Sequence, residues 1–380
     1  MKVIMVDSLT GNDYSTCLCE KLHDLGVDVH LIVPENKEFQ GTEKFTIKYL
    51  APSKIKDKTK LRKSVGFIKY FLTLYKYIMS NKPDIVHYQF FRRKSGILLY
   101  KLLKLKKVNL VHTAHNVLPH EKNKIDYLLT SIVYKNSKRI IVHSNFIKNK
   151  LLKSFPIESE KVKIVPHGNF DIYLPAEKVN AIKIRQLFNL TYADNVILFF
   201  GFIREYKGLD TLLDAFELAA SKDAKLKLLI AGFATKKHER FYSNKINRSK
   251  YKDRIIFHAG YVPKENIIRY FAVSDAVILP YKEIDHSGIV HLAYSFGKPV
   301  IATNVGDFNE VIENNKNGIL LNGNNAEELA EKITEAFANK QKLVEMGQYA
   351  RELSETKYSW RDVAKGTISV YEETTRYSNK

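Results

Sequence analysis

Short apolar runs alternate with amphipathic segments along the whole chain. Apolar runs of this length have the size of buried strands, and the segments between them carry apolar residues at helical spacing. In the first half we expect strands at residues 2–6, 29–33, 84–88, 109–113, 139–143 and 163–166. The helices expected between them cover residues 14–25, 65–80, 96–105, 125–136 and 145–154. Strands separated by helices predict parallel pairing with crossover helices, and hence a doubly wound sheet.

The same pattern restarts after residues 176–192. The strands expected in this second half are residues 195–200, 226–231, 254–258, 276–279, 299–302 and 318–321. A chain of 380 residues is long enough for two domains with separate cores. The sequence therefore predicts an α/β protein with two Rossmann-like, doubly wound parallel-sheet domains that face a cleft. The expected divisions are residues 1–172, 173–358 and 359–380, the last a closing helix that packs back toward the first domain.

Positive charge is concentrated in the first of these domains. Residues 1–172 contain 31 Lys and Arg against 15 Asp and Glu, whereas the remainder contains 30 against 26. The formal net charge of the whole chain is +20. A positive electrostatic field concentrated on one domain predicts an anionic partner for that domain.

Two lysine-rich segments, residues 54–63 and 101–107, interleave cations with apolar residues. An aromatic-rich amphipathic helix over residues 67–78 follows the first segment. This pattern is typical of segments that bind an anionic cytoplasmic membrane surface, where each cation contributes about 1 kcal/mol. A solvated helix face explains the charges equally well. No nucleic acid is expected as a partner, because the chain has no helix–turn–helix, RRM or zinc-finger pattern.

The bulk composition indicates a globular protein, with 45% hydrophobic and 27% charged residues. No uninterrupted apolar run approaches the roughly 20 residues that span a bilayer, and the first residues predict a strand rather than a signal peptide. Cys17 and Cys19 lie two residues apart in an expected helix and point to different faces, so no disulfide is expected. We expect a cytoplasmic location. Peripheral attachment to the inner face of the cell membrane is a further hypothesis, based on the lysine-rich segments.

A candidate phosphate-binding loop follows the expected strand at residues 195–200. Gly201 ends this strand, Arg204 and Lys207 lie in the loop, and a helix is expected to begin near Gly208. A strand, a cationic loop and a helix N-terminus suit a phosphorylated ligand, because free amides point outward and the side chains neutralise charge. Taken alone, such a pair of cations is more simply explained as part of a solvated surface loop.

A second anion-binding pattern covers residues 287–303. Ser287 is expected to cap a helix, Gly297 to end it, and Pro299 to precede the next strand. Gly288 would let a ligand approach the first free amides of this helix. Many helices begin with Ser-Gly and bind nothing. Two such patterns in one domain nevertheless favour a diphosphate held by two cations and a helix end.

These motifs resemble those of the GT-B glycosyltransferases of family 4, which use nucleotide-sugar donors. The run Phe-Phe-Gly-Phe-Ile-Arg-Glu-Tyr-Lys-Gly-Leu-Asp at residues 199–210 is similar to their donor diphosphate loop, and residues 297–303 to the segment after their donor helix. Residues 111–121, 165–169, 229–232 and 274–281 extend the resemblance over nearly the whole chain. It implies a donor site formed by Gly201, Phe202, Arg204, Lys207, Gly232, Tyr281, Ser287, Gly288 and Ile289.

The chain departs from the common family pattern in the loop after residue 200. Phe202 stands where an arginine usually follows the loop glycine. Arg204 is the nearest candidate for that role, as in a subgroup that reads Gly-x-Ile-Arg-x-Tyr-Lys-Gly. Lys207 takes the place of the family lysine.

A second departure concerns two glutamates that usually precede the Gly-Lys-Pro segment. Their positions would be Ile284 and Leu292, and neither is acidic. The resemblance is therefore to a subgroup in which Ser-Gly replaces the pair, and the identity of the donor sugar does not carry over. Glu283 is a candidate replacement contact to the donor, as is Asp285; ordinary loop charges are the alternative.

The run of residues 111–121 resembles the acceptor-side histidine segment of the family. The resemblance gives His115 a role in orienting the donor sugar, whereas the residues alone suggest a structural histidine. His120 and Glu121 are weaker candidates for the acceptor site.

The loop after the first strand contains further acceptor-side candidates. Gly11, Asn12 and Tyr14 resemble part of the family's acceptor loop, a plain strand-to-helix turn being the alternative. His167, in a late loop of the first domain, is expected to face the cleft as well.

Metal and cofactor patterns are absent from the sequence. The chain has no Asp-x-Asp motif and no His or Cys spacing that suggests a metal cage, so neither a metal nor a cofactor is expected. The expected catalytic residues are His115, Arg204 and Lys207. The two cations and the helix amides would neutralise the charge of the leaving group.

The sequence as a whole predicts transfer of a sugar from a nucleoside-diphosphate sugar to a hydroxyl acceptor. The expected acceptor is a glycan or a lipid-linked glycan in exopolysaccharide, capsule or lipopolysaccharide assembly, and the resemblance implies retention of configuration. The alternatives are a nucleotide-sugar epimerase and a binding protein that has lost catalysis. A dinucleotide dehydrogenase is disfavoured because no Gly-x-Gly-x-x-Gly follows an expected strand.

Overall fold

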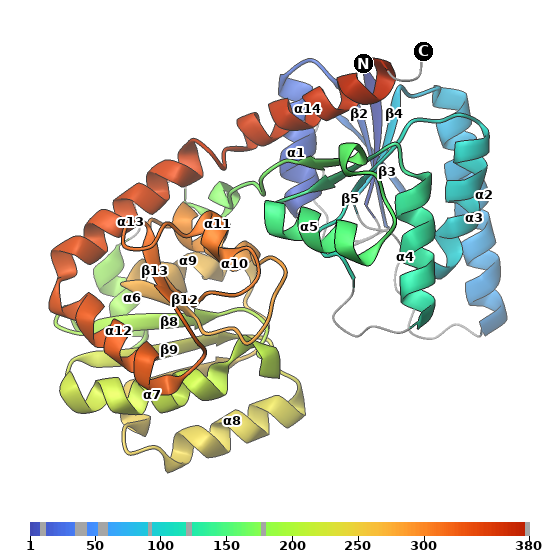
Figure 1. Ribbon diagram of the computed structural model, residues 1–380. Helices are drawn as coiled ribbons and strands as arrows, with labels where there is room; N and C mark the ends of the chain where they lie inside the picture. Colours follow the sequence, from blue (N-terminus) through green and yellow to red (C-terminus); the bar gives the residue numbers. More distant parts are fainter. Residues whose placement is uncertain are drawn as a thin grey trace. The chain divides into compact units, whose positions relative to one another are not determined.

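A computed structural model describes residues 1–7, 13–34, 44–51, 60–89, 93–118, 124–175 and 180–376. The chain forms two compact units (Figure 1). Unit 1 comprises Met1–Gly168 together with Ser359–Lys380, and unit 2 comprises Asn169–Tyr358. The C-terminal helix therefore belongs to the same unit as the N-terminal strand.

Unit 1 is built on a parallel sheet that has seven strands within the described residues, in the order β3-β2-β1-β4-β5-β6-β7. Each strand pairs in parallel with its neighbours, as the alternation of apolar runs and helices predicts. The strands are β1 (Lys2–Val6), β2 (Asp28–Pro34), β3 (Thr46–Ala51), β4 (Ile85–Tyr88), β5 (Leu110–Thr113), β6 (Arg139–Val142) and β7 (Val162–Ile164).

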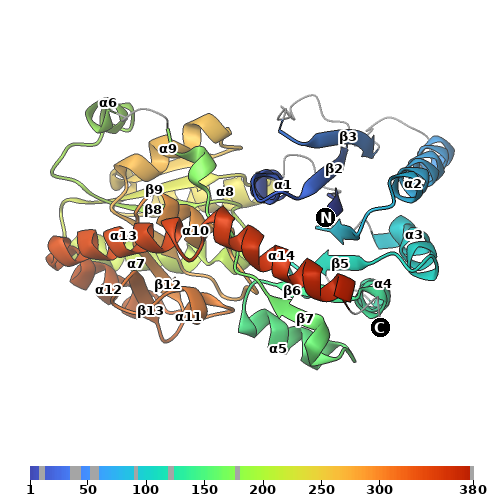
Figure 2. The same cartoon turned by 90° about the horizontal axis from the view of Figure 1, so that it is seen from above.

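Helices cover both faces of this sheet. Helices α2 to α5 share one core with it, which includes Leu74, Leu103, Val133 and Leu151. Helix α1 packs against α14, and both contribute to the core on the other face (Figures 1 and 2). The helices are α1 (Asp13–Asp24), α2 (Lys60–Asn81), α3 (Arg93–Leu105), α4 (Lys124–Asn136), α5 (Asn145–Ser154), the short η1 (Ser159–Lys161) and α14 (Trp360–Arg376).

Unit 2 repeats this plan with a parallel sheet that has six strands in its described part, in the order β10-β9-β8-β11-β12-β13. Most of its strand residues are buried, which is why the strands read as continuous apolar runs. The strands are β8 (Asn195–Phe200), β9 (Leu226–Gly232), β10 (Ile255–Ala259), β11 (Ala276–Leu279), β12 (Val300–Thr303) and β13 (Gly318–Leu321).

The helices of unit 2 also lie on both sheet faces. One core contains residues of α7, α8 and α12, and the other contains residues of α6, α9, α10 and α13. The helices are α6 (Ala181–Leu187), α7 (Leu209–Lys222), α8 (Lys236–Arg248), α9 (Lys264–Val273), α10 (Gly288–Ser295), α11 (Phe308–Val311), α12 (Ala326–Ala338) and α13 (Lys340–Glu355), with short turns η2 (Asp171–Tyr173), η3 (Glu205–Lys207) and η4 (Lys252–Arg254).

The predicted class, two doubly wound parallel-sheet domains, is confirmed by these strand orders. Strand β3 was not predicted. It is an edge strand with several exposed residues, among them Thr46, Lys48 and Tyr49, so it lacks the apolar run that reveals the buried strands. Among the described helices, none is both long and apolar enough to cross a bilayer.

In each sheet the strand order reverses at one point. In unit 2 the reversal lies between β8 and β11, and in unit 1 between β1 and β4. Ligands of open α/β sheets bind outside the carboxyl ends of the strands at such a point. The loops that follow β8 and β11 are therefore the expected site of unit 2.

Candidate functional site

Gly201 and Gly232 end the neighbouring strands β8 and β9, and their backbones lie in close contact. Gly201 has a φ of +109° and Gly232 a φ of +152°. A Cβ atom at Gly232 would lie 1.7 Å from the carbonyl oxygen of Gly201. Only glycine fits at residue 232, so the backbone at this sheet edge is left uncovered by a side chain.

Lys207 follows Gly201 in the 3₁₀ turn η3 and is buried, with 7% of its surface exposed. Its Nζ lies 3.8 Å from the centroid of the Tyr281 ring, a geometry in which the aromatic face attracts the cation. No described carboxylate forms an ion pair with it. The ammonium group is thus held in place by an aromatic ring, and its charge is not compensated within the part of the chain that the structure describes.

The loop after β11 is joined to the loop after β8 by backbone contacts. The Lys282 N–H donates to the carbonyl of Tyr206 at 2.8 Å. A Cβ atom at Gly208, which has a φ of +69°, would lie 1.8 Å from the Pro280 carbonyl oxygen. These contacts fix Lys207 relative to the end of β11.

Helix α10 begins beside the same two loops. Ser287 is its N-cap, and the Ser287 Oγ accepts a hydrogen bond from the Ile289 N–H at 3.4 Å. The Tyr281 hydroxyl lies 3.5 Å from the Ser287 Oγ. The Ile289 side chain would meet a Cβ atom at Gly201 at 3.4 Å. The positive end of α10 therefore adjoins the glycine edge of β8.

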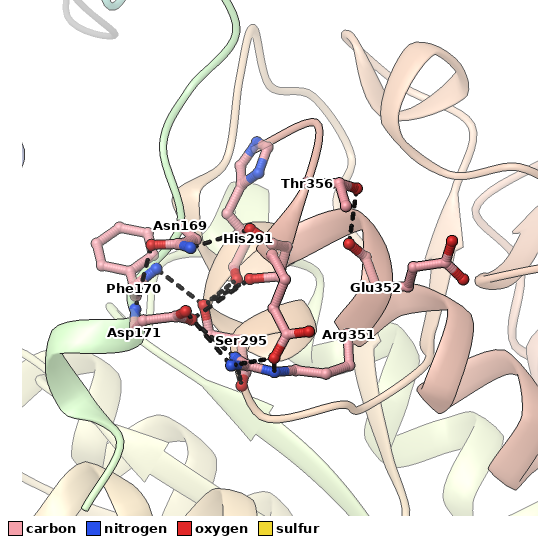
Figure 3. A network of polar contacts seen from close by, with 10 residues as sticks. Asn169, Phe170, Asp171, His291, Ser295, Arg351, Glu352 and Thr356 are labelled. Atoms are coloured by element: carbon pink, nitrogen blue, oxygen red, sulfur yellow. Dashed lines mark hydrogen bonds and ion pairs between the residues drawn. The ribbon is translucent and has the colours of Figure 1, made fainter. Parts of the chain in front are cut away.

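The far end of α10 is anchored by a polar network (Figure 3). The Ser295 Oγ accepts from the Phe170 N–H at 2.8 Å and donates to the His291 carbonyl at 3.1 Å. Arg351 of α13 donates to Asp171 at 2.8 Å and to the Ser295 carbonyl at 2.6 Å. This network holds α10 in one orientation. A helix can bind a ligand through its first amides only if its orientation is fixed in this way.

Three other predicted donor residues are less enclosed. Arg204 caps η3 and its side chain is exposed, with the guanidinium carbon 6.0 Å from the centroid of the Phe202 ring. Phe202 and Glu283 are exposed, whereas Asp285 is buried. The structure thus brings together Gly201, Lys207, Gly232, Tyr281, Ser287 and Ile289, with Gly288 between the last two. It leaves Arg204 on the surface of the loop.

Burial lowers the pKa of Lys207 to about 8, mainly by desolvating the ammonium group. At neutral pH the side chain still carries its charge in most molecules. A buried, uncompensated cation beside a helix N-terminus attracts a polyanion strongly, because little solvent screens it. This arrangement suits the stabilisation of a diphosphate.

We expect the affinity for a nucleoside diphosphate to fall as the pH rises above about 8, by up to about tenfold per pH unit. The free protein loses the Lys207 proton in this range, whereas the bound diphosphate favours the protonated form. Titration calorimetry between neutral pH and pH 10 would measure the trend. Lys207→Met is the matched control and should show no such decline; an equal decline in both proteins would contradict the assignment.

His115 follows β5 and lies at the carboxyl edge of the unit 1 sheet. Its Nε2 is 3.0 Å from the Gln89 Oε1, and its Nδ1 is 3.0 Å from the His143 Nε2. The His143 Nδ1 donates to the Val165 carbonyl at 3.0 Å. Both ring nitrogens of His115 are therefore engaged within unit 1, and a ligand contact through either nitrogen would have to replace one of these hydrogen bonds.

Tyr14 lies at the centre of the same cluster. Its ring centroid is 4.8 Å from that of His115, 5.0 Å from that of His167 and 4.9 Å from that of Trp360. Three predicted residues, Tyr14, His115 and His167, thus meet at one sheet edge. The remaining acceptor-side candidates lie outside the described residues: Gly11, Asn12, His120 and Glu121.

Sequence reasoning missed His143, Gln89 and Trp360 in unit 1. His143 directly follows β6, so the rule that parallel strands end at one edge could have placed it beside His115. In unit 2 it missed Asn324, whose side-chain amide donates to the Pro280 carbonyl at 2.8 Å. No local pattern marks this residue.

Comparison with known families agrees with this geometry. Residues 181–353 match the family described as glycosyl transferases group 1, and residues 13–168 match the family described as glycosyltransferase family 4. Together the two matches cover most of both units. The chain belongs to the GT-B glycosyltransferases of the family 4 type.

Similarity to individual proteins supports this family assignment. An uncharacterized glycosyltransferase of Methanocaldococcus jannaschii is 28% identical in an alignment that covers 80% of this chain and 81% of the relative. An uncharacterized 41.2 kDa protein in the cps region of Klebsiella pneumoniae is 24% identical in an alignment that covers 98% of this chain and 99% of the relative. The crystal structure of Anabaena HepE in complex with UDP matches with a TM-score of 0.79, 16% identity and coverage of 98% and 100%. This last similarity concerns the fold.

Proposed function

We propose that the protein transfers a sugar from a nucleoside-diphosphate sugar to a hydroxyl group of a glycan or lipid-linked glycan, with retention of configuration. In this proposal unit 2 binds the donor. Unit 1 binds the acceptor at the inner face of a membrane. The observation that carries the donor assignment is the Lys207 ammonium, buried over Tyr281 beside the N-terminus of α10.

Departure of the diphosphate is the step that this geometry favours. Negative charge grows on the leaving group as the glycosidic bond breaks, and preorganised cations and amides stabilise it without reorganising. Lys207 and the first amides of α10 would contact the diphosphate directly. Arg204, on the exposed side of the loop, would close over it from solvent. No metal ion is needed in this proposal, because these groups supply the positive charge.

The bound UDP of the Anabaena structure supports a nucleotide-sugar donor, and the Klebsiella relative supports a role in surface polysaccharide assembly. The strongly basic composition of residues 1–172 supports an anionic or membrane-borne acceptor. Retention rests on the family resemblance.

A thermal-shift screen of UDP-, GDP- and other nucleotide sugars should identify the donor as the compound that raises the melting temperature most. A ligand at about 100 times its dissociation constant adds about 2.7 kcal/mol to the stability of the protein that binds it. The best donor should then be turned over with a glycan acceptor, including in the presence of EDTA. Interconversion of the donor without an acceptor would favour an epimerase, and binding without any turnover would favour a degenerate binding protein; either result would contradict the proposal.

A further inference from the structure

The outer side of helices α2, α3 and α4 exposes an unusual number of large apolar side chains. Six of them are between 52% and 77% exposed to solvent. These residues define the α2–α4 face: Ile68, Leu72, Leu98, Leu105, Ile125 and Leu128. Single exposed leucines are common on soluble proteins, but a cluster on adjacent helices indicates a surface that binds a partner.

The six side chains point away from the core of unit 1. Leu74, Leu103 and Val133, on the opposite sides of the same helices, are buried against the sheet. Helix α3 packs against both α2 and α4, so the three helices form one continuous layer (Figures 1 and 2). The exposed residues of α2, Ile68 and Leu72, are one turn apart and therefore lie on one side of that helix.

Cations surround these apolar residues. The three helices carry five, four and two Lys or Arg residues, and their one acidic residue is Asp126. Among the described side chains, Lys69, Lys76, Lys101 and Lys104 are exposed. Leu98 and Lys101 lie three residues apart on α3, as do Lys101 and Lys104, so apolar and cationic groups occupy the same surface.

We propose that the α2–α4 face docks on an anionic phospholipid bilayer. Its leucines and isoleucines would enter the acyl boundary while the lysines pair with headgroup phosphates, the arrangement expected of an interfacial surface. Nucleic acid accounts for the lysines but leaves the apolar side chains without a partner. The proposal agrees with a lipid-linked acceptor, as given under the proposed function, and its test is independent of catalysis.

The test is co-flotation of the full chain with vesicles of phosphatidylcholine containing one third phosphatidylglycerol. Leu72→Ser combined with Leu98→Ser and Leu105→Ser should reduce the vesicle partition coefficient by at least about tenfold, because each leucine contributes apolar burial. Exchanging Lys69, Lys101 and Lys104 for glutamine should have an effect of at least the same size. The control exchanges three similarly exposed residues of unit 2 for serine, Leu187, Phe241 and Val344, and should bind like the wild type.

The vesicle experiment has outcomes that support membrane docking of the α2–α4 face and outcomes that contradict it. Binding that is weak on pure phosphatidylcholine and that weakens with added salt supports the proposal. Unchanged binding of the triple leucine variant, or binding to RNA without binding to vesicles, would overturn it. Equal melting temperatures of the variants show that the fold is intact. Vesicle binding without donor turnover would contradict the proposed function alone, and turnover of a water-soluble acceptor without vesicle binding would contradict this inference alone.

Discussion

Replacing Lys207 with methionine is expected to lower kcat/KM for the donor by about 10²-fold or more, the usual loss when one preorganised charge-stabilising group is removed. Methionine fills a similar volume over the Tyr281 ring but brings no charge to the leaving diphosphate. Steady-state kinetics with the donor identified by thermal shift would measure the loss. Lys207→Ala should be at least as severe.

The same substitution is expected to stabilise the free protein, by about 2 kcal/mol at pH 7. Burial lowers the Lys207 pKa from 10.5 to about 8, so the folded state binds this proton less tightly than the unfolded chain. The resulting penalty is fully present below pH 8 and disappears as the pH rises to the unfolded pKa. Loss of the contact with Tyr281 offsets part of the gain.

These two effects together separate a functional lysine from a structural one. A structural lysine would lose activity and stability in parallel when replaced. A higher melting temperature combined with a loss of turnover supports the account, whereas a lower melting temperature, or normal turnover, would refute it. Lys282→Met, which removes an exposed lysine that pairs with Asp210, is the matched control and should change turnover little.

Exchange of Gly208 for alanine is expected to destabilise unit 2 by about 3 kcal/mol or more and to weaken donor binding. The residue has a φ of +69°, and its new Cβ atom would lie 1.8 Å from the Pro280 carbonyl oxygen. Relief of this clash would separate the Lys207 loop from the end of β11. Denaturant unfolding and calorimetric titration with the nucleotide would measure both effects.

Alanine substitutions at two other glycines distinguish the cost of backbone strain from the cost of the steric clash. Gly26 has a φ of +83° with no atom within 4 Å of a Cβ, so Gly26→Ala should cost about 1 to 2 kcal/mol. Gly260 has neither feature, and Gly260→Ala should stay within about 0.5 kcal/mol of the wild type. Equal losses for Gly208→Ala and Gly26→Ala would show that contact with Pro280 is unimportant.

The sequence predicted the sheets well because most of their strands are buried on both faces. Strands β8 and β11 read as unbroken apolar runs, and their predicted bounds agree with the structure. Strand β3 lies at an edge with polar, exposed residues, so no such signal was available. The position of the candidate phosphate-binding loop follows from the same strands, since Arg204 and Lys207 come soon after β8.

Long-range contacts within the site could not be predicted in the same way. Lys207 lies over Tyr281, 74 positions later in the chain, because the order of β8 and β11 in the sheet makes their ends adjacent. His115 hydrogen-bonds to His143 for the same reason, through the pairing of β5 with β6. A local pattern identifies such residues singly, but only the strand order shows which of them meet.

The most direct test of the central claim is a crystal structure of the protein with a bound nucleoside diphosphate. We expect phosphate oxygens within about 3 Å of the Lys207 Nζ and of the first amides of α10. A diphosphate bound elsewhere on the protein, with the Lys207 ammonium left in contact with Tyr281 alone, would contradict it.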